Sequence, residues 1–133
     1  MAVLIDTDLL VDVERGVGAP EVDALLGDEE RAISVVTVSE LLHGVHRASG
    51  ARRAKRGAFV EHLLAGIDAI PITEPVARVH AEVWAQLAER GHLIGAHDLW
   101  IAATAIGHGL ALATGNASDF KRVPGLRVLS PTA

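Results

Sequence analysis

The amino-acid sequence predicts an α/β fold of three layers, α/β/α, in which helices cover both faces of a short, mainly parallel central sheet. Short apolar segments alternate with amphipathic helical segments along the chain, which is the pattern of parallel strands joined by crossover helices. The 133 residues contain no Cys, so disulfides and thiolate metal sites are excluded. Without a linker, repeat or low-complexity segment, residues 1–133 are expected to form one domain.

The segment up to position 36 predicts two strands joined by two helices. Residues 2–5 form an apolar run that ends in an acid, as a buried strand does before a turn. Apolar residues then recur at helical spacing until Gly16, and Pro20 can open a second helix. Residues 32–36 are rich in β-branched side chains, so we expect the second strand there.

Two helices and a third strand are expected next. Thr37 and Glu40 have the spacing of a capping box, in which a Thr N-cap is followed by Glu three residues later. The helix that they begin runs to about Gly50, and residues 51–66 form a second amphipathic helix. A third strand is expected over residues 67–72, with a proline near its end.

The remaining chain predicts two long helices and two strands. The longest helix spans residues 74–90, where Val and Leu recur at intervals of three and four. An alanine-rich helix follows over residues 97–106, and its small side chains allow it to lie close against the sheet. Strands are expected over residues 110–114 and 126–129, with a turn or short helix at 116–120 between them.

Acidic residues stand beside these strand ends and helix starts. The set consists of Asp6, Glu40, Asp98 and Asp119. Taken singly, each has a capping explanation, but strand ends and helix starts collect at one edge of a parallel sheet, so we expect the four carboxylates to converge. Converging carboxylates raise one another's pKa unless a cation compensates their charge. Mg²⁺ or Mn²⁺ prefers such oxygen ligands, and the ion can activate water and stabilise the leaving oxygen of a phosphodiester.

Four sequence blocks carry a resemblance to a known family. In chain order they are Ile5–Asp8, Val38–Glu40, Asp98–Ala103, and Thr114–Asn116 followed by Asp119–Phe120. Their order and spacing, over essentially the whole chain, resemble the PIN domain and, more narrowly, VapC-type toxins of bacterial toxin–antitoxin systems. The resemblance implies a PIN-like domain and a magnesium-dependent endoribonuclease toxin whose acidic cluster is the set of four acids above.

The same resemblance implies supporting residues and partners. Thr114 and Asn116 would be polar supports of the acidic cluster. RNA would be the substrate, a VapB-like antitoxin would wrap the toxin and block its site, and the toxin would form a homodimer within that larger complex. The sequence does not name the RNA, the cleavage site or the number of metal ions.

Roles within the acidic cluster can be stated as a hypothesis. Asp6 and Asp98 would bind the main metal directly, with Mg²⁺ expected and Mn²⁺ as the alternative. Glu40 would help to hold the ion or orient the attacking water, and Asp119 would complete the shell or a second site. Asp8 stands where relatives often carry Asn or Ser, and its role stays open.

Charge and hydrophobicity bear on partners and location. The formal net charge of −5 argues against nucleic-acid affinity through bulk charge. Five of the twelve Lys and Arg nevertheless fall within ten residues, as Arg47, Arg52, Arg53, Lys55 and Arg56. This cluster is either a solvated helix surface or an RNA-binding patch. No apolar run approaches the roughly 20 residues of a membrane span, and no signal peptide precedes the first strand, so we expect a soluble, cytoplasmic protein without membrane contact.

A few further side chains have two interpretations. His97 adjoins Asp98 and could touch substrate, although neighbouring helix positions face different directions. Trp84 and Trp100 are the only tryptophans, and we expect both to pack in the core, with an interface role as the alternative. Aromatic residues make up 3% of the chain, which disfavours base stacking as the principal mode of RNA binding.

Other functions remain as alternatives. Asp6 and Asp8 after the first strand resemble the nucleophile motif of haloacid-dehalogenase-type phosphatases, and Thr37 could serve as the phosphate-binding hydroxyl, but no well-placed Lys or late acidic pair follows. A magnesium-binding, non-catalytic receiver-like module would need a central phosphoacceptor, and Asp68 lies inside the third strand rather than at its end. An acid-lined scaffold without catalysis is the remaining reading.

Overall fold

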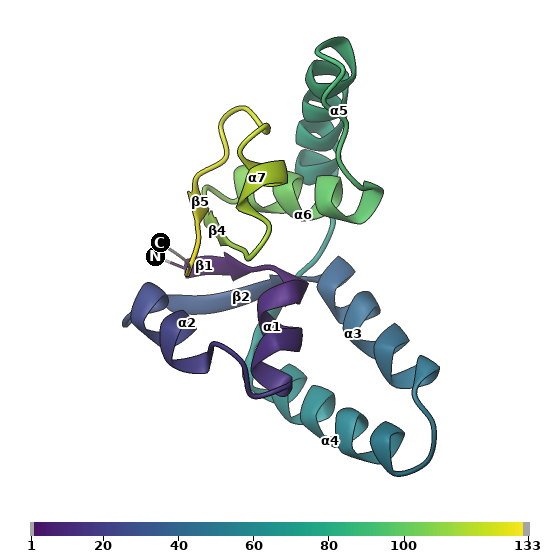
Figure 1. Ribbon diagram of the computed structural model, residues 1–133. Helices are drawn as coiled ribbons and strands as arrows, with labels where there is room; N and C mark the ends of the chain where they lie inside the picture. Colours follow the sequence, from purple (N-terminus) through teal and green to yellow (C-terminus); the bar gives the residue numbers. More distant parts are fainter. Residues whose placement is uncertain (1, 132–133) are drawn as a thin grey trace.

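A computed structural model describes residues 2–131, in which a five-stranded sheet lies between two layers of helices (Figure 1). The strand order is β3-β2-β1-β4-β5, and every neighbouring pair is parallel. The strands are β1 Ala2–Ile5, β2 Glu30–Ser34, β3 Asp68–Ile70, β4 Ala111–Ala113 and β5 Val128–Leu129. The predicted three-layer class with a mainly parallel sheet is confirmed.

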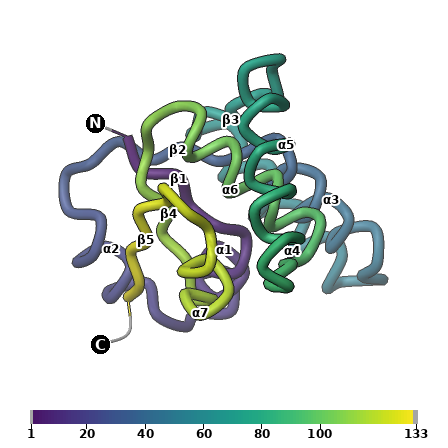
Figure 2. The backbone as a smooth tube through the Cα atoms, turned by 90° about the horizontal axis from the view of Figure 1, so that it is seen from above, coloured from purple at the N-terminus to yellow at the C-terminus, as the bar shows by residue number. Residues whose placement is uncertain are grey.

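Alternate side chains of the central strand enter two separate cores. Val3 and Ile5 pack on one face of the sheet, and Leu4 packs on the other. The helices that cover the first face are α1 Thr7–Glu14, α2 Ala19–Leu26, α3 Val35–Arg47 and α4 Gly50–Gly66. The second face is covered by α5 Glu74–Glu89, α6 Ala96–Gly107 and α7 Ala117–Phe120 (Figure 2).

Helix α6 packs against the sheet through a buried side on which small residues accompany Leu99 and Ile101. Ala102, Ala103 and Ala105 are each 0% exposed, and Ala102 and Ala105 share a core with Leu4 of β1. A residue at the start of α6 is therefore carried to the carboxyl edge of the central strands, which is where Asp98 stands.

The boundary between β2 and α3 lies earlier than the sequence predicted. The Ser34 hydroxyl accepts a 3.0 Å hydrogen bond from the Val36 backbone N–H, so Ser34 caps a helix that begins at Val35. Thr37 is instead a fully buried residue inside α3, and Glu40 lies in the second turn. The predicted capping box, and with it the start of the helix at Glu40, was wrong because Ser34 competes successfully as the cap.

The outer strands are shorter than the predicted ones. β3, β4 and β5 cover only parts of the predicted segments 67–72, 110–114 and 126–129. Pro71 follows β3 directly and has no N–H to donate to the strand ladder, which limits the length of that strand.

None of the helices within residues 2–131 combines the length and the apolar character needed to cross a bilayer.

Candidate active site

Asp6 and Thr114 stand side by side at the carboxyl ends of β1 and β4. Ile5 pairs with Ala113 in the parallel ladder, and the Asp6 N–H donates to the Ala113 carbonyl at 2.9 Å. The Thr114 hydroxyl donates to Asp6 Oδ2 at 2.7 Å, and the Thr7 N–H donates to Asp6 Oδ1 at 2.8 Å. Each oxygen of the Asp6 carboxylate therefore accepts one hydrogen bond, from a donor that follows β1 and from a donor that follows β4, and the two bonds fix its orientation.

The Asp6 carboxyl is hard to ionise in this position. Asp6 is 4% exposed, and its carboxyl has a pKa raised to about 7. Burial is the largest cause of the rise, the negative charges of Asp8 and Asp98 add to it, and the hydrogen bonds from Thr114 and Thr7 oppose it. A bound cation would remove this penalty, because it would favour the charged form of the carboxyl.

Asp98 lies in the first turn of α6, and its carboxyl is also affected by the negative charges of the neighbouring acids. Burial raises the pKa of its carboxyl, and Glu40, Asp119 and Asp8 raise it further, while His97 lowers it. The N-cap of α6 is Gly95, so Asp98 is not the cap itself but an acid in the first turn of the helix.

Glu40 reaches the site from the second turn of α3. The Thr7 hydroxyl donates to Glu40 Oε1 at 2.6 Å, and Thr37 Oγ1 lies 3.0 Å from the same hydroxyl oxygen. His97 Nδ1 lies 3.3 Å from Glu40 Oε2, so the histidine next to Asp98 contacts a carboxylate of the site. These contacts hold Glu40 between α1 and α6.

Asp119 is connected to Thr114 and Asp6 through Asn116. Asn116 links it to the strand end, because the Asn116 N–H donates to Thr114 Oγ1 at 2.9 Å and its side-chain amide donates to Asp119 Oδ2 at 3.0 Å. Arg122 also lies 3.8 Å from Asp119 Oδ1. The sequence-predicted supports Thr114 and Asn116 are thus both within the hydrogen-bonded network of the acids.

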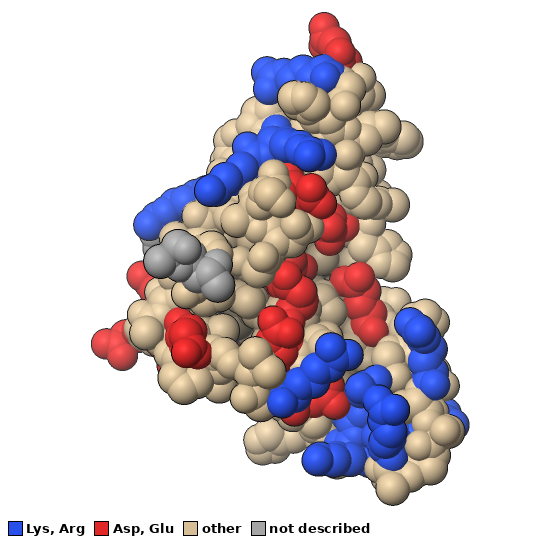
Figure 3. Space-filling model, in the orientation of Figure 1, with Lys and Arg blue, Asp and Glu red and all other residues tan. Residues whose placement is uncertain are grey.

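The acids surround a cavity of about 410 Å³. It is lined by Asp6, Thr7, Asp8, Val11, Asp12, Arg15, Glu40, Asp98 and Asn116. Three of the four sequence-predicted acids are in this lining, and Asp119 is not. Figure 3 shows acidic side chains running through the middle of this face of the molecule.

Helix α1 and its C-cap supply cavity residues that the sequence analysis did not assign to the site, apart from Asp8, whose role it left open. Asp8, Val11, Asp12 and Arg15 follow one another at intervals of three, one and three, so they share one face of the helix. Their helical spacing could have identified this face as the one lining the cavity, whereas the apolar residues of α1 identify only the buried face. Thr7 had no signal in the sequence beyond its place between two acids.

Gly115 allows the Asp8 carboxylate to approach the main chain. The Gly115 N–H donates to Asp8 Oδ1 at 3.3 Å and to Oδ2 at 3.1 Å. A Cβ atom at position 115 would lie 2.9 Å from Asp8 Oδ2, so the Asp8 carboxylate would have to move to make room for it. The close contact gives Asp8 a position in the site and gives Gly115 a reason to lack a side chain.

The cavity has the oxygen donors that a hard divalent cation prefers, but no three of its described acidic side chains are close enough together to bind an ion directly. The cavity offers carboxylate, hydroxyl and amide oxygens, the donor set that Mg²⁺ and Mn²⁺ take. Within residues 2–131, however, no three acidic or histidine side chains converge closely enough to hold an ion as they stand. Mg²⁺ keeps several of its waters, so two direct carboxylate ligands are sufficient for the fit.

The predicted basic patch divides into two groups. Arg47, Arg52 and Arg56 line a separate cavity at the junction of α3 and α4. Arg53 instead lies 3.3 Å from His46 Nδ1, and neither it nor Lys55 is in that lining. Three of the five cations therefore share one cavity, and the other two do not line it.

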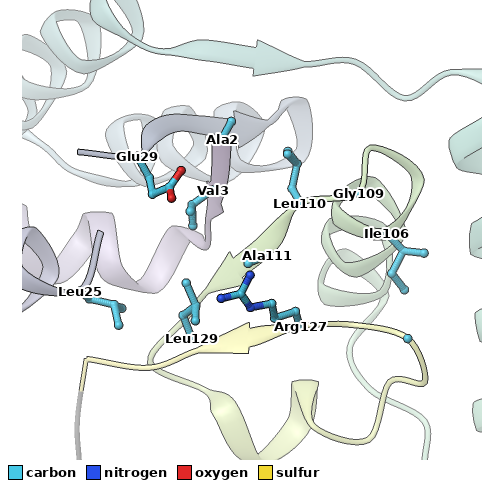
Figure 4. Close-up of a pocket in the computed structure, with 11 residues that line it drawn as sticks. Ala2, Val3, Leu25, Glu29, Ile106, Gly109, Leu110, Ala111, Arg127 and Leu129 are labelled. Carbon is cyan, nitrogen blue, oxygen red and sulfur yellow. The ribbon is translucent and has the colours of Figure 1, made fainter. Parts of the chain in front are cut away.

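A further cavity, of about 380 Å³, lies at the opposite edge of the sheet, where β1 and β4 begin (Figure 4). Its lining is largely apolar, and its charged residues are Glu29 and Arg127. With a single carboxylate, this cavity lacks the grouped acids that distinguish the site at the carboxyl edge.

The two tryptophans differ in environment. The Trp100 ring stacks on the His80 ring with 3.5 Å between centroids, and burial lowers the pKa of His80. Trp84 meets the same histidine edge-on at 5.7 Å but is 53% exposed. The expectation that Trp84 packs in the core was wrong, because its ring lies at the surface in the lining of a shallow cavity beside Leu93 and Trp100.

Comparison with known proteins agrees with the fold. The family model of the PIN domain matches residues 3–126. Ribonuclease VapC1 of Rickettsia felis is 36% identical over 131 residues, which cover 98% of this chain and 96% of that protein.

Solved structures give the same result. VapBC-5 of Mycobacterium tuberculosis, a member of the VapBC family of toxin–antitoxin systems, is 32% identical, with a TM-score of 0.79 over 97% of this chain and 96% of that chain. Rickettsia felis VapBC2 bound to a promoter DNA fragment shares the fold, with a TM-score of 0.87 over 98% of each chain and 24% identity. With the domain match and the full-length relative together, the chain belongs to the PIN domain family, in its VapC ribonuclease group.

Proposed function

We propose that this protein is a magnesium-dependent endoribonuclease and the toxin of a toxin–antitoxin pair. The observation that carries the proposal is the Asp6 carboxyl, which is buried, has its pKa raised to about 7, and stands beside the charges of Asp8 and Asp98. Such a group is poised for a cation at neutral pH. The full-length relative named as a ribonuclease supports RNA as the polymer that is cut.

Asp6 and Asp98 would hold the ion directly, and Glu40 and Asp119 would complete its surroundings. When bound, Mg²⁺ or Mn²⁺ lowers the pKa of water and neutralises negative charge that develops on the phosphate. The chain itself supplies orientation: the donors Thr114 and the Thr7 N–H fix the two oxygens of the Asp6 carboxylate. No side chain is required as a covalent nucleophile, because water attacks phosphorus in hydrolysis.

Glu40 is the residue of this chain best suited to orient the attacking water. Its Oε1 is engaged by the Thr7 hydroxyl, while its Oε2 lies at the cavity beside the exposed ring of His97. Each carboxylate oxygen has two lone pairs, so Oε2 can accept a hydrogen bond or a proton from water in addition to its contact with His97. Asn116 performs the comparable task for Asp119 through its side-chain amide.

The partners follow from the relatives. The VapBC structures are complexes of toxin–antitoxin systems, so we expect a VapB-like antitoxin that covers the acidic cavity and a homodimer of the toxin within the assembly. RNA contacts outside the cavity are expected from the three members of the predicted basic patch that line one cavity, Arg47, Arg52 and Arg56.

The phosphatase alternative receives little support from the surroundings of Thr37. That hydroxyl is 0% exposed and lies against Thr7, and it is not among the residues that line the acidic cavity. A phosphate in the cavity would therefore not meet it.

One assay separates the candidates. The purified chain is incubated with a structured RNA and, separately, with a phosphoester dye, each with Mg²⁺ and with EDTA. Our proposal expects RNA fragments only in the presence of Mg²⁺ and no release of dye. Dye hydrolysis without RNA cleavage would favour the phosphatase, and intact RNA and dye under all conditions would favour a non-catalytic module.

A further inference from the structure

Four arginines converge on a cavity of about 350 Å³ next to the acidic site. The cavity is lined by Arg15, Gly44, Arg47, Ala48, Ser49, Arg52 and Arg56. Arg15 follows the end of α1, Arg47 ends α3, and the other two belong to α4. The end of α1 and the consecutive helices α3 and α4 thus bring their cations to one place.

One arginine is anchored and three are uncompensated. Arg56 donates to Glu14 Oε1 at 3.1 Å and to the Gly44 carbonyl at 3.4 Å, with its side chain only 22% exposed. Within the described chain, no carboxylate lies within ion-pair distance of Arg15, Arg47 or Arg52. Like charges gathered in this way repel one another, and an anion between them removes the repulsion.

The start of α4 adds positive character to the same cavity. Ser49 is the N-cap of this 17-residue helix, yet among residues 2–131 its side chain forms no capping hydrogen bond. Ala48 and Ser49 line the cavity, so the start of α4, where a helix has unpaired N–H groups and the positive end of its dipole, lies at a space already lined by guanidinium groups. Guanidinium forks and helix N-termini are both groups that bind phosphate oxygens.

The arginine cavity and the acidic cavity share a wall. Arg15 lines both of them, and Figure 3 shows Lys and Arg gathered over the α3–α4 region directly beside the acidic band. A polyanion that enters the acidic cavity is repelled by its carboxylates, and neighbouring cations offset that repulsion. A chain of phosphates can meet both sites at once, which an isolated anion cannot do.

We propose that Arg15, Arg47, Arg52 and Arg56 form a binding site for one backbone phosphate of the RNA strand, adjacent to the acidic cavity. The inference rests on the proposed ribonuclease function and adds Arg15 to the RNA-binding residues. It also removes Arg53 and Lys55, which stand on the same helix but do not line the cavity. The phosphate is one that neighbours the cleaved linkage rather than the cleaved phosphate itself.

Binding of a fluorescent single-stranded RNA in EDTA, over a series of salt concentrations, tests this site without any need for cleavage. In the double variant Arg15→Gln/Arg47→Gln, affinity should fall on the order of tenfold, and the slope of log affinity against log salt should decrease by about 0.7, the value for one phosphate contact on a single strand. Arg15→Lys/Arg47→Lys keeps the charge and should retain most of the slope.

The matched control is Arg53→Gln/Lys55→Gln, which removes the same charge from the same region. It should change affinity by less than about twofold and leave the slope nearly unchanged. Equal or larger losses in this control, an unchanged Arg15→Gln/Arg47→Gln variant, or no RNA binding by the unaltered protein would each overturn the site. If the unaltered protein binds RNA through these arginines but never cleaves it with Mg²⁺, the proposed function fails and the phosphate site stands.

Discussion

The Thr114 hydroxyl donates a 2.7 Å hydrogen bond to Asp6 Oδ2, joining two buried residues that are 108 positions apart in the chain. The bond holds the Asp6 carboxylate at the end of β1 and opposes the effect of burial on its pKa. Thr114 also accepts a hydrogen bond from the Asn116 N–H, so a single hydroxyl organises both sides of the candidate site. The predictions below begin from this contact.

Replacing Thr114 with Val removes the hydroxyl and keeps the shape of the side chain. We expect the Mg²⁺ concentration for half-maximal RNA cleavage to rise by about tenfold or more, since residues that orient a ligand affect metal affinity to this extent. Thr104→Val is the matched control, because Thr104 is also 0% exposed and its hydroxyl donates to the Trp100 carbonyl away from the cavity. Equal effects of the two variants would show that only a general loss of stability is being measured.

Gly115→Ala should displace the Asp8 carboxylate, because the added Cβ would lie 2.9 Å from Asp8 Oδ2. We expect cleavage to slow by several-fold, and we expect a smaller loss when the same change is made in an Asp8→Ser background. Non-additivity of this kind reports a direct contact. Gly66→Ala, at a position where a Cβ meets nothing within 4 Å, is the control. Purely additive effects of the two substitutions would contradict a direct contact between Gly115 and Asp8.

In EDTA, the stability of the protein should depend on pH through Asp6. The pKa of this carboxyl is raised in the folded state, so its protonated form is favoured there, and the stabilisation present below pH 3.8 is lost as pH rises through about 7. The change in the free energy of unfolding is on the order of a few kcal/mol. The raised pKa of Asp98 acts in the same direction.

Asp6→Asn should remove most of this pH dependence, because Asn stays neutral. Thermal unfolding in EDTA should show the variant gaining stability relative to the unaltered protein between pH 5 and pH 8. Asp68→Asn, at an exposed position on β3, should leave the pH profile as it is. A profile of Asp6→Asn parallel to that of the unaltered protein would contradict the raised pKa.

The two tryptophans should differ in their effects on stability. Trp100→Ala removes a ring stacked on His80 and should lower the free energy of unfolding by at least about 2 kcal/mol, whereas Trp84→Ala should lower it by less than about 1 kcal/mol. Urea unfolding of both variants measures the difference. Similar losses would mean that the exposed ring of Trp84 is covered in solution.

The sequence predicted the edge at which the site forms better than the local structure of each residue. Glu40 was expected at a helix start, but Ser34 takes that place and Glu40 lies in the second turn of α3. It still reaches the site, because α3 leaves β2 at the carboxyl edge of the sheet whichever residue caps the helix. Topology was therefore a more robust guide than capping chemistry.

What the sequence could not predict depends on contacts between distant elements. Arg15 joins Arg47 only because α1 and α3 pack against the same face of the sheet. Trp84 follows Val83, which is 3% exposed, but helical periodicity does not reveal which side of α5 is left without a covering layer. Asp119 was grouped with the other acids, yet Asn116 holds it outside the cavity lining.

The measurement that tests the central claim most directly is the rate of Mg²⁺-dependent RNA cleavage by Asp98→Asn beside Asp68→Asn, with both variants shown to be folded by circular dichroism. Loss of one proposed metal ligand should slow cleavage by at least about a hundredfold, while the exposed control on β3 keeps the rate of the unaltered protein. A folded Asp98→Asn protein that cleaves RNA as fast as the control would contradict the account.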